Sequence, residues 1–148
     1  MTEINYRDAQ VPIRGGFAEA HNRYWKRLAS AGAWFSGAER VAIAREVRQA
    51  SSCSLCSQRK AALSPYQVDG SHDTASELSD TIIEVIHRVV TDSARLTKPW
   101  FDGIIQQGLK VEEYVEIIGT IVNLFSIDEF CRGRSISLNE LPEPVAGE

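Results

Sequence analysis

The sequence predicts an all-α fold, a bundle of about six helices that forms a single domain over residues 1–148. Apolar residues recur at the three- and four-residue spacing of amphipathic helices along most of the chain. Residues that start and stop helices bracket these segments, and no segment shows the strict alternation of a half-buried strand. At 148 residues, the chain is long enough to bury a core without disulfides or metals.

The first helix is expected over residues 17–31, after a loose lead-in of residues 1–16 that ends in two glycines. The second helix begins at Ser36-Gly-Ala-Glu39, which matches the capping-box pattern. In that pattern the serine hydroxyl and the glutamate carboxylate each satisfy a free backbone N–H. This helix is expected to continue to about Ala50.

Two serines, Ser51 and Ser52, separate the second helix from a third, which is expected from Cys53 to about Leu63. Either serine can cap the new helix, and the Ser-Pro pair that follows stops it. Residues 65–76 carry turn-forming side chains and are predicted to form an exposed loop.

Three further helices complete the predicted bundle. One is expected over residues 77–93, and a short one runs from Thr97-Lys-Pro to Gln107. The last, residues 111–132, is the longest and is apolar over more than one stripe. Such a helix is either the central helix of the bundle or packs its second face against another subunit. Residues 135–148 are expected to form an irregular tail.

The composition argues against two classes of protein. The net charge is -4, the pI is about 5.4, and Lys and Arg do not cluster, so nucleic acid is not an expected partner. The longest apolar stretch, residues 111–130, carries acidic side chains that a bilayer core would penalise, and the N-terminus lacks the pattern of a signal peptide. We therefore expect no membrane association and a cytoplasmic protein whose thiols are kept reduced.

The most pointed chemical feature is the pair Cys53-x-x-Cys56 at the start of the third helix. Free N–H groups and the positive end of the helix dipole favour a thiolate there, and the thiolate is the form that attacks peroxides and disulfides. The spacing places both sulfurs on one side of the first turn, where one thiol can resolve the sulfenic acid of the other. Arg59 and Lys60 add positive charge one turn later.

Two other interpretations of the pair remain open. The thiols can be inert and buried, or they can form half of a zinc site. Zinc requires four ligands, and the chain has no second Cys-x-x-Cys and no His-x-x-x-His. His72 and His87 could join only if the tertiary structure brought them there, so no metal and no cofactor are expected. A thioredoxin-like setting is not indicated, because no βαβ pattern surrounds the pair.

Residues 36–133 resemble the alkylhydroperoxidase D and carboxymuconolactone decarboxylase-like family. The resemblance rests on the cysteine pair and on the stretch of residues 113–130, Glu-Tyr-Val-Glu-Ile-Ile-Gly-Thr-Ile-Val-Asn-Leu-Phe-Ser-Ile-Asp-Glu-Phe. It covers about two thirds of the chain. It implies an all-α fold that assembles into trimers or hexamers, so we expect a homo-oligomer.

The resemblance also implies roles for individual residues. Cys56 would attack the peroxide and Cys53 would resolve it, although the dipole argument alone favours Cys53 at least as strongly. The family relays protons through a glutamate and a histidine. The histidine position is occupied by Lys60 here, and the glutamate position is Val41 by strict count. Glu39 fits that position if two extra residues precede the pair. We therefore expect weaker or differently directed peroxidase activity.

Other polar residues are expected to have structural roles. Glu46 is expected on a solvated helix face, and His87 is favoured as a hydrogen-bonded structural histidine. His21 and His72 are expected at the surface, and Cys131 is expected to be a half-buried small apolar residue.

The sequence thus favours a thiol-dependent peroxidase. It would reduce a hydroperoxide through Cys56, form a disulfide with Cys53, and be recycled by a dithiol reductant or a redox carrier protein, with Glu39 and Lys60 as candidate proton or charge partners. The alternative is a non-enzymatic helical oligomer on the same scaffold, either redox-responsive or purely structural.

Overall fold

The computed structural model describes residues 3–147, and this part of the chain folds into six α-helices and two short 3-10 helices without a strand. The predicted all-α class is confirmed, as is the expected number of about six helices. The α-helices are α1 (Gly15–Ala29), α2 (Gly37–Ala50), α3 (Ser54–Ala61), α4 (Asp80–Asp92), α5 (Lys98–Gln106) and α6 (Val111–Gly133), and the 3-10 helices are η1 (Pro65–Gln67) and η2 (Ser93–Arg95).

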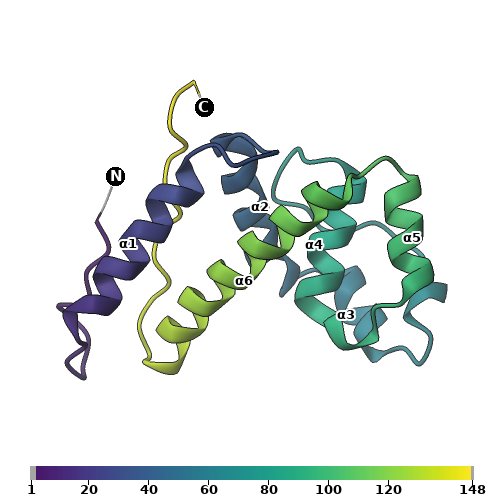
Figure 1. Cartoon of the computed structure of the whole chain (residues 1–148). Coiled ribbons are helices and arrows are strands. Elements are labelled where there is room, and N and C mark those ends of the chain that lie inside the picture. Colours follow the sequence, from purple (N-terminus) through teal and green to yellow (C-terminus); the bar gives the residue numbers. More distant parts are fainter. Residues whose placement is uncertain (1–2, 148) are drawn as a thin grey trace.

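Helices α2, α4 and α6 form the centre of the molecule. Each of the three packs against the other two, while α1 covers α2 and α6, and α3 packs against α4. Figure 1 shows α6 crossing the molecule, with α1 at one end and α3 at the other. The centre of the core is made by fully buried aliphatic side chains of these helices: Val41, Ile43, Ala44, Val85, Ile86, Ile117 and Leu124.

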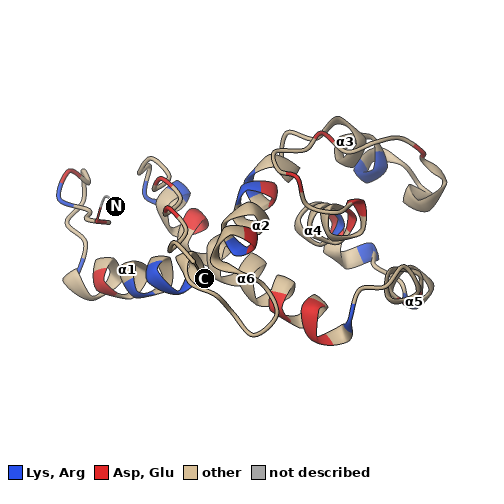
Figure 2. Cartoon of the chain, turned by 90° about the horizontal axis from the view of Figure 1, so that it is seen from above, with Lys and Arg blue, Asp and Glu red and all other residues tan. Residues whose placement is uncertain are grey.

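Helix α6 buries one apolar face and exposes the other. Its buried face supplies Ile117, Ile121, Leu124 and Ile127. On the opposite side Val111, Val115 and Val122 are 49%, 62% and 59% exposed. Helix α6 packs against α1, α2 and α4 through its buried face. The interpretation in which the other face packs against another subunit, and the expected homo-oligomer, stay predictions. The first turn of α6 carries Glu112 and Glu113 (Figure 2), which complement the positive end of the helix dipole. Within residues 3–147, no helix has both the length and the apolar character of a membrane span.

The starts of α2 and α5 follow the predicted caps, and α4 starts later than expected. Ser36 and Glu39 form the capping box, since each side chain accepts a hydrogen bond from the other residue's backbone N–H, at 3.2 and 2.8 Å. Thr97 caps α5 as expected. Helix α4 begins at Asp80, three residues later than expected, because the Ser79 hydroxyl accepts the backbone N–H of Ile82 and fixes the start there.

The two terminal segments are tied to the core. The first residues were expected to be loose, but Ile4 and Tyr6 are buried, and the Asn22 side chain bonds both backbone groups of Ile4 at 2.8 and 2.7 Å. The expectation of a loose lead-in is therefore wrong for Ile4 and Tyr6, while residues 1 and 2 lie outside the described part of the chain. The tail after α6 is irregular, as predicted, and Trp25 holds it by donating its indole N–H to the Glu140 carbonyl at 2.8 Å.

Candidate functional site

The cysteine pair lies where α2 ends and α3 begins. Cys53 occupies the N-cap position of α3 and Cys56 lies in its first turn. The serines before the pair were expected to cap α3, but the hydroxyls of Ser51 and Ser52 accept no N–H of that helix and instead donate to carbonyls in the last turn of α2. The N–H of Ser54 is satisfied from elsewhere in the chain, as described below. Both cysteines are free thiols and are only 2% and 3% exposed.

The segment predicted to be an exposed loop folds back over the pair. The Asp73 carboxylate accepts the backbone N–H of Ser54 at 2.7 Å, which caps α3, and the Asp73 N–H donates to the Cys53 sulfur at 3.3 Å. The same turn carries His72, whose side chain is only 9% exposed. The expectation that His72 lies at the surface is therefore wrong, because two bonds through Asp73 anchor its loop to the start of α3.

His72 faces both sulfurs. Its Nδ1 lies 3.6 Å from the Cys53 sulfur and 3.5 Å from the Cys56 sulfur. Its Nε2 lies 2.6 Å from a carboxylate oxygen of Glu84 on α4. The Arg59 guanidinium donates to the same carboxylate at 2.9 Å, so this arginine holds Glu84 in place rather than facing a thiolate.

A second histidine approaches from α4. His87 Nδ1 lies 3.3 Å from the Cys56 sulfur, and its Nε2 lies 2.8 Å from a carboxylate oxygen of Glu46. The side chains of His87 and Glu46 are both completely buried. The expected hydrogen bonding of His87 is confirmed, and the structure adds the contact of this histidine with Cys56.

Glu46 is the buried anchor of this end of the molecule. One of its oxygens accepts the backbone N–H of Ala75 at 2.7 Å and the hydroxyl of Ser76 at 2.8 Å, while the other faces His87. The expectation of a solvated Glu46 is therefore wrong. Its side of α2 packs against α4, and three donors replace water around the carboxylate.

Two of the four predicted site residues lie away from the sulfurs. Glu39 is in the first turn of α2, whereas Cys53 follows the last turn. Ala50 lies eleven positions after Glu39, so roughly 16 Å of helix separates Glu39 from the pair. Glu39 completes the capping box instead. Lys60 is exposed and its ammonium donates to the Thr91 carbonyl at 2.7 Å. The positions that the resemblance assigned to a proton relay are thus used for capping and for tying α3 to α4.

The electrostatics of the cluster favour a thiolate on Cys56. Burial alone would raise the pKa of this thiol, but hydrogen bonds from His72 and His87 outweigh burial and lower the pKa to about 6. Burial alone would lower the pKa of His72, and its contacts with Cys56 and Glu84 instead raise that pKa to about 10. Burial acts in the same way on His87, whose pKa is raised by its contacts with Cys56 and Glu46.

Cys53 is less strongly activated. Burial raises the pKa of its thiol, while the backbone amides of Cys56 and Asp73 act the other way and leave the pKa below its ordinary value. The Glu84 carboxyl has its pKa lowered to about 2, because His72 and Arg59 outweigh its burial. Glu84 therefore stays charged throughout the range in which Cys56 loses its proton.

The thiolate of Cys56 should form near pH 6 in the reduced, metal-free protein. Its alkylation rate should rise with pH to half of its maximum near that pH and fall at lower pH, because only the thiolate reacts. Rates measured by mass spectrometry from pH 4 to about pH 10 check this. Cys131 is an internal comparison, since burial raises the pKa of its thiol. A half-maximum close to that of the unfolded protein would contradict the arrangement described.

The sequence did not lead to Glu46 or Glu84 as members of the cluster, and it offered His72 and His87 only as residues that the tertiary structure would have to recruit. A signal existed for two of the four. Glu46 lies on the same stripe of α2 as Ile43 and Ala50, three residues after one and four before the other. His87 lies four residues after Ile83 on α4. A charged or titratable side chain inside an apolar stripe indicates a buried polar group. His72 gave no such signal, because it lies in a segment without periodicity.

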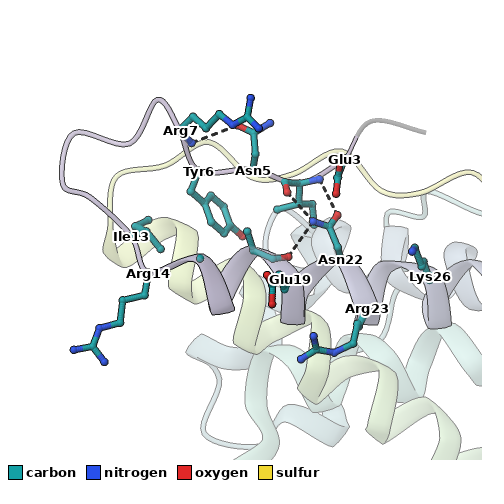
Figure 3. A pocket seen from close by; sticks show the side chains of 13 residues that line it. Glu3, Asn5, Tyr6, Arg7, Ile13, Arg14, Glu19, Asn22, Arg23 and Lys26 are labelled. Atoms are coloured by element: carbon teal, nitrogen blue, oxygen red, sulfur yellow. Dashed lines mark hydrogen bonds between the residues drawn. The ribbon is translucent and has the colours of Figure 1, made fainter.

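A cavity of about 650 Å³ lies at the other end of the molecule. Figure 3 shows it between the N-terminal segment and α1, with Tyr6 and Asn22 among its walls. The Tyr6 hydroxyl lies 2.6 Å from Nδ1 of His21 and 3.9 Å from the Cys131 sulfur. His21 was expected at the surface but is half-buried. Cys131 is fully buried rather than half-buried. This region is separate from the reactive pair.

A smaller cavity of about 310 Å³ adjoins the cysteine cluster. His72 and Glu84 form the side of this cavity that faces the sulfurs, and Gly70, Thr74 and Gln107 contribute to the rest of it. Both sulfurs are buried, and His72, which contacts them, is one of the residues that line this cavity.

Comparisons of the chain with protein-family models, with curated proteins and with solved structures found no match, so the function has to be argued from the geometry of Cys53, Cys56, His72 and His87.

Proposed function

We propose that the chain is a dithiol–disulfide oxidoreductase that reduces small hydroperoxides through Cys53 and Cys56. The observation that carries the proposal is the position of the Cys56 sulfur, 3.5 and 3.3 Å from the Nδ1 atoms of His72 and His87. The Nε2 atom of each imidazole is within hydrogen-bond distance of a carboxylate. An activated nucleophile needs a neighbouring base that a third group orients, and Cys56 has two such bases.

The first step is an attack by the Cys56 thiolate on one peroxide oxygen. The S–O bond forms as the O–O bond breaks, so that the sulfur is oxidised to sulfenic acid and the peroxide is reduced. The alkoxide that leaves takes a proton from the His87 imidazolium and departs as an alcohol. Glu46 holds His87 in place and stabilises its charged form.

The second step closes the disulfide. The Cys53 thiolate, which the His72 imidazolium stabilises at 3.6 Å, attacks the sulfur of the Cys56 sulfenic acid. The S–S bond forms as the S–O bond breaks, and the hydroxide that leaves takes a proton from His72 and departs as water. An external dithiol, either a small molecule or a carrier protein, then restores both thiols and is itself oxidised to a disulfide.

The order of the two cysteines rests on their surroundings. The Cys56 sulfur lies 3.5 and 3.3 Å from the two imidazoles, whereas the Cys53 sulfur lies 3.6 Å from that of His72. The pKa that is lowered to about 6 belongs to Cys56. This order agrees with the roles that the family resemblance implies. The proton relay differs from the one that the resemblance implies. In place of Glu39 and Lys60, we assign it to the two imidazoles, each with its carboxylate: His72 with Glu84, and His87 with Glu46.

The burial of the pair predicts a preference for small substrates. Cys56 is 3% exposed and the adjoining cavity measures about 310 Å³, with His72 between the cavity and the sulfurs. Hydrogen peroxide should therefore oxidise the reduced protein faster than cumene hydroperoxide does. Stopped-flow measurements of the loss of free thiols, with equal concentrations of each peroxide, test this. Equal rates, or a faster reaction of the bulky peroxide, would contradict the proposed access.

One observation favours the alternative of a non-enzymatic redox-responsive or structural oligomer. Both thiols are buried and all four side chains of the cluster already have partners inside the protein. The exposed valines of α6 supply an apolar face that a trimer or hexamer could cover.

A peroxide-consumption assay with dithiothreitol or a lipoyl donor separates the two functions. Turnover, together with a mass decrease of two hydrogens in the oxidised chain, supports the enzyme. Thiols that resist peroxide in the folded protein support the structural role.

A further inference from the structure

The four side chains of the cluster have the donor types and the spacing of a tetrahedral metal site. The two sulfurs and the two histidine Nδ1 atoms all lie within 4.8 Å of one another. A tetrahedral Zn²⁺ has Zn–S bonds of about 2.3 Å and Zn–N bonds of about 2.0 to 2.1 Å, which give S···N edges of about 3.6 Å. The three S···N distances described above, 3.6, 3.5 and 3.3 Å, are close to that edge length.

Hydrogen bonding alone accounts poorly for this geometry. The Nδ1 atom of His72 lies 3.6 and 3.5 Å from the two sulfurs, yet one N–H can point along only one of these directions. A metal ion at the centre of the four donors satisfies all of them at once. Two thiolates and a divalent cation also make a neutral unit, which suits a site where both cysteines and His87 are buried.

The outer contacts of the histidines are those that metal-binding histidines make. His72 and His87 both point Nδ1 at the sulfurs and Nε2 at a carboxylate, at 2.6 Å from Glu84 and 2.8 Å from Glu46. A histidine that binds zinc through one nitrogen characteristically donates its other N–H to a carboxylate or carbonyl, which fixes the tautomer and the ring orientation. The carboxylates are themselves held, Glu84 by Arg59 and Glu46 by the loop that carries Ala75.

Helix α3 has few apolar contacts, so a bound ion would stabilise its position. The helix has only eight residues, and Cys53, Leu55 and Cys56 form a small cluster separate from the main core, with Val68 packed against it. So few apolar contacts hold a short helix weakly. The four donors come from α3, from the loop after it and from α4, so a bound ion would join these three segments.

We propose that Cys53, Cys56, His72 and His87 together bind one Zn²⁺ ion in the reduced protein. The ion and the Cys53–Cys56 disulfide are mutually exclusive states of the same two sulfurs. This inference goes beyond the proposed reaction, because metal binding requires neither peroxide nor turnover.

Titration with Co²⁺, which absorbs where Zn²⁺ is silent, tests the site. Reduced protein freed of metal with a chelator should bind one Co²⁺ per chain, with a thiolate-to-metal charge-transfer band and the intense d–d bands of a tetrahedral ion, and Zn²⁺ should displace it. Cys56→Ser should weaken binding more than about 100-fold, since loss of a ligand exceeds the 10- to 100-fold effect of losing an outer partner. Glu84→Gln should show that smaller effect. Cys131→Ser, which changes the cysteine outside the cluster, should bind as the wild type does.

Absence of the charge-transfer band in the wild-type protein, or a Co²⁺ affinity of Cys56→Ser equal to that of the wild type, would overturn the assignment. If that variant does not fold, as judged by circular dichroism, the oxidised wild-type protein serves instead, because a disulfide leaves no thiolates to bind the ion. Co²⁺ binding by the oxidised protein overturns the site as well. Peroxide turnover is assayed on the metal-free protein and metal binding on the reduced protein without peroxide, so failure of one proposal is distinguishable from failure of the other.

Discussion

Replacement of Cys56 by serine should lower hydroperoxide turnover at least about 10³-fold, as expected when the nucleophile of a covalent mechanism is lost. A serine hydroxyl is nearly isosteric with the thiol and can bond the same two histidines, which lie 3.5 and 3.3 Å from the sulfur. It cannot be oxidised by a peroxide through a sulfenic acid. The loss therefore reports on chemistry rather than on packing, and dithiol-dependent peroxide consumption under steady-state conditions measures it.

Two matched variants sharpen this result. Cys53→Ser should still react once with peroxide, giving a sulfenic acid on Cys56 that dimedone traps, but should not form the intramolecular disulfide. Cys131→Ser should keep normal turnover, because Cys131 lies in the main core beside Tyr6. Full turnover by Cys56→Ser would remove this residue from the mechanism. If dimedone trapped a sulfenic acid on Cys53 in Cys56→Ser, the roles of the two cysteines would be reversed.

Replacement of Glu46 by leucine should lower the free energy of unfolding by about 3 to 5 kcal/mol, the range seen when one partner of a buried charged pair is removed. The carboxylate is fully buried and accepts hydrogen bonds from Ala75, Ser76 and His87. Leucine has a similar volume but accepts none of these bonds, so three donors, among them the buried His87, lose their acceptor. Urea denaturation of the reduced protein, followed by circular dichroism, gives the difference.

The conservative change Glu46→Gln separates stability from chemistry. An amide oxygen can still accept from Ala75 and Ser76, but the uncharged side chain no longer stabilises a charged His87. The pKa of Cys56 should therefore rise above its value of about 6, while stability falls less than in Glu46→Leu. Glu39→Gln is the matched control, the same change near the exposed start of α2, and should leave the pKa of Cys56 unchanged. An unchanged thiol pKa in Glu46→Gln would break the proposed link between Glu46 and Cys56.

Local signals in the sequence were sufficient for the helices. The capping box at Ser36, the Thr97 cap of α5 and the long apolar period of α6 each act over a few residues, and each led to a correct element. Where the sequence expectation failed, a longer-range contact decided the outcome. The start of α3 is one example, because the Ser54 N–H is satisfied by Asp73, nineteen residues later, rather than by the adjacent serines.

The sequence by itself determined the all-α class and the position of a cysteine pair at the start of a helix, because helix periodicity, caps and Cys-x-x-Cys spacing are properties of neighbouring residues. Only the tertiary structure decided which side chains surround the sulfurs. His72 is sixteen residues from Cys56, His87 is thirty-one residues away, and Glu46 is forty-one residues from His87. These separations have no period that a sequence pattern could reveal. The packing of α2 and α3 against α4 brings these residues together and places buried carboxylates and imidazoles beside the thiols.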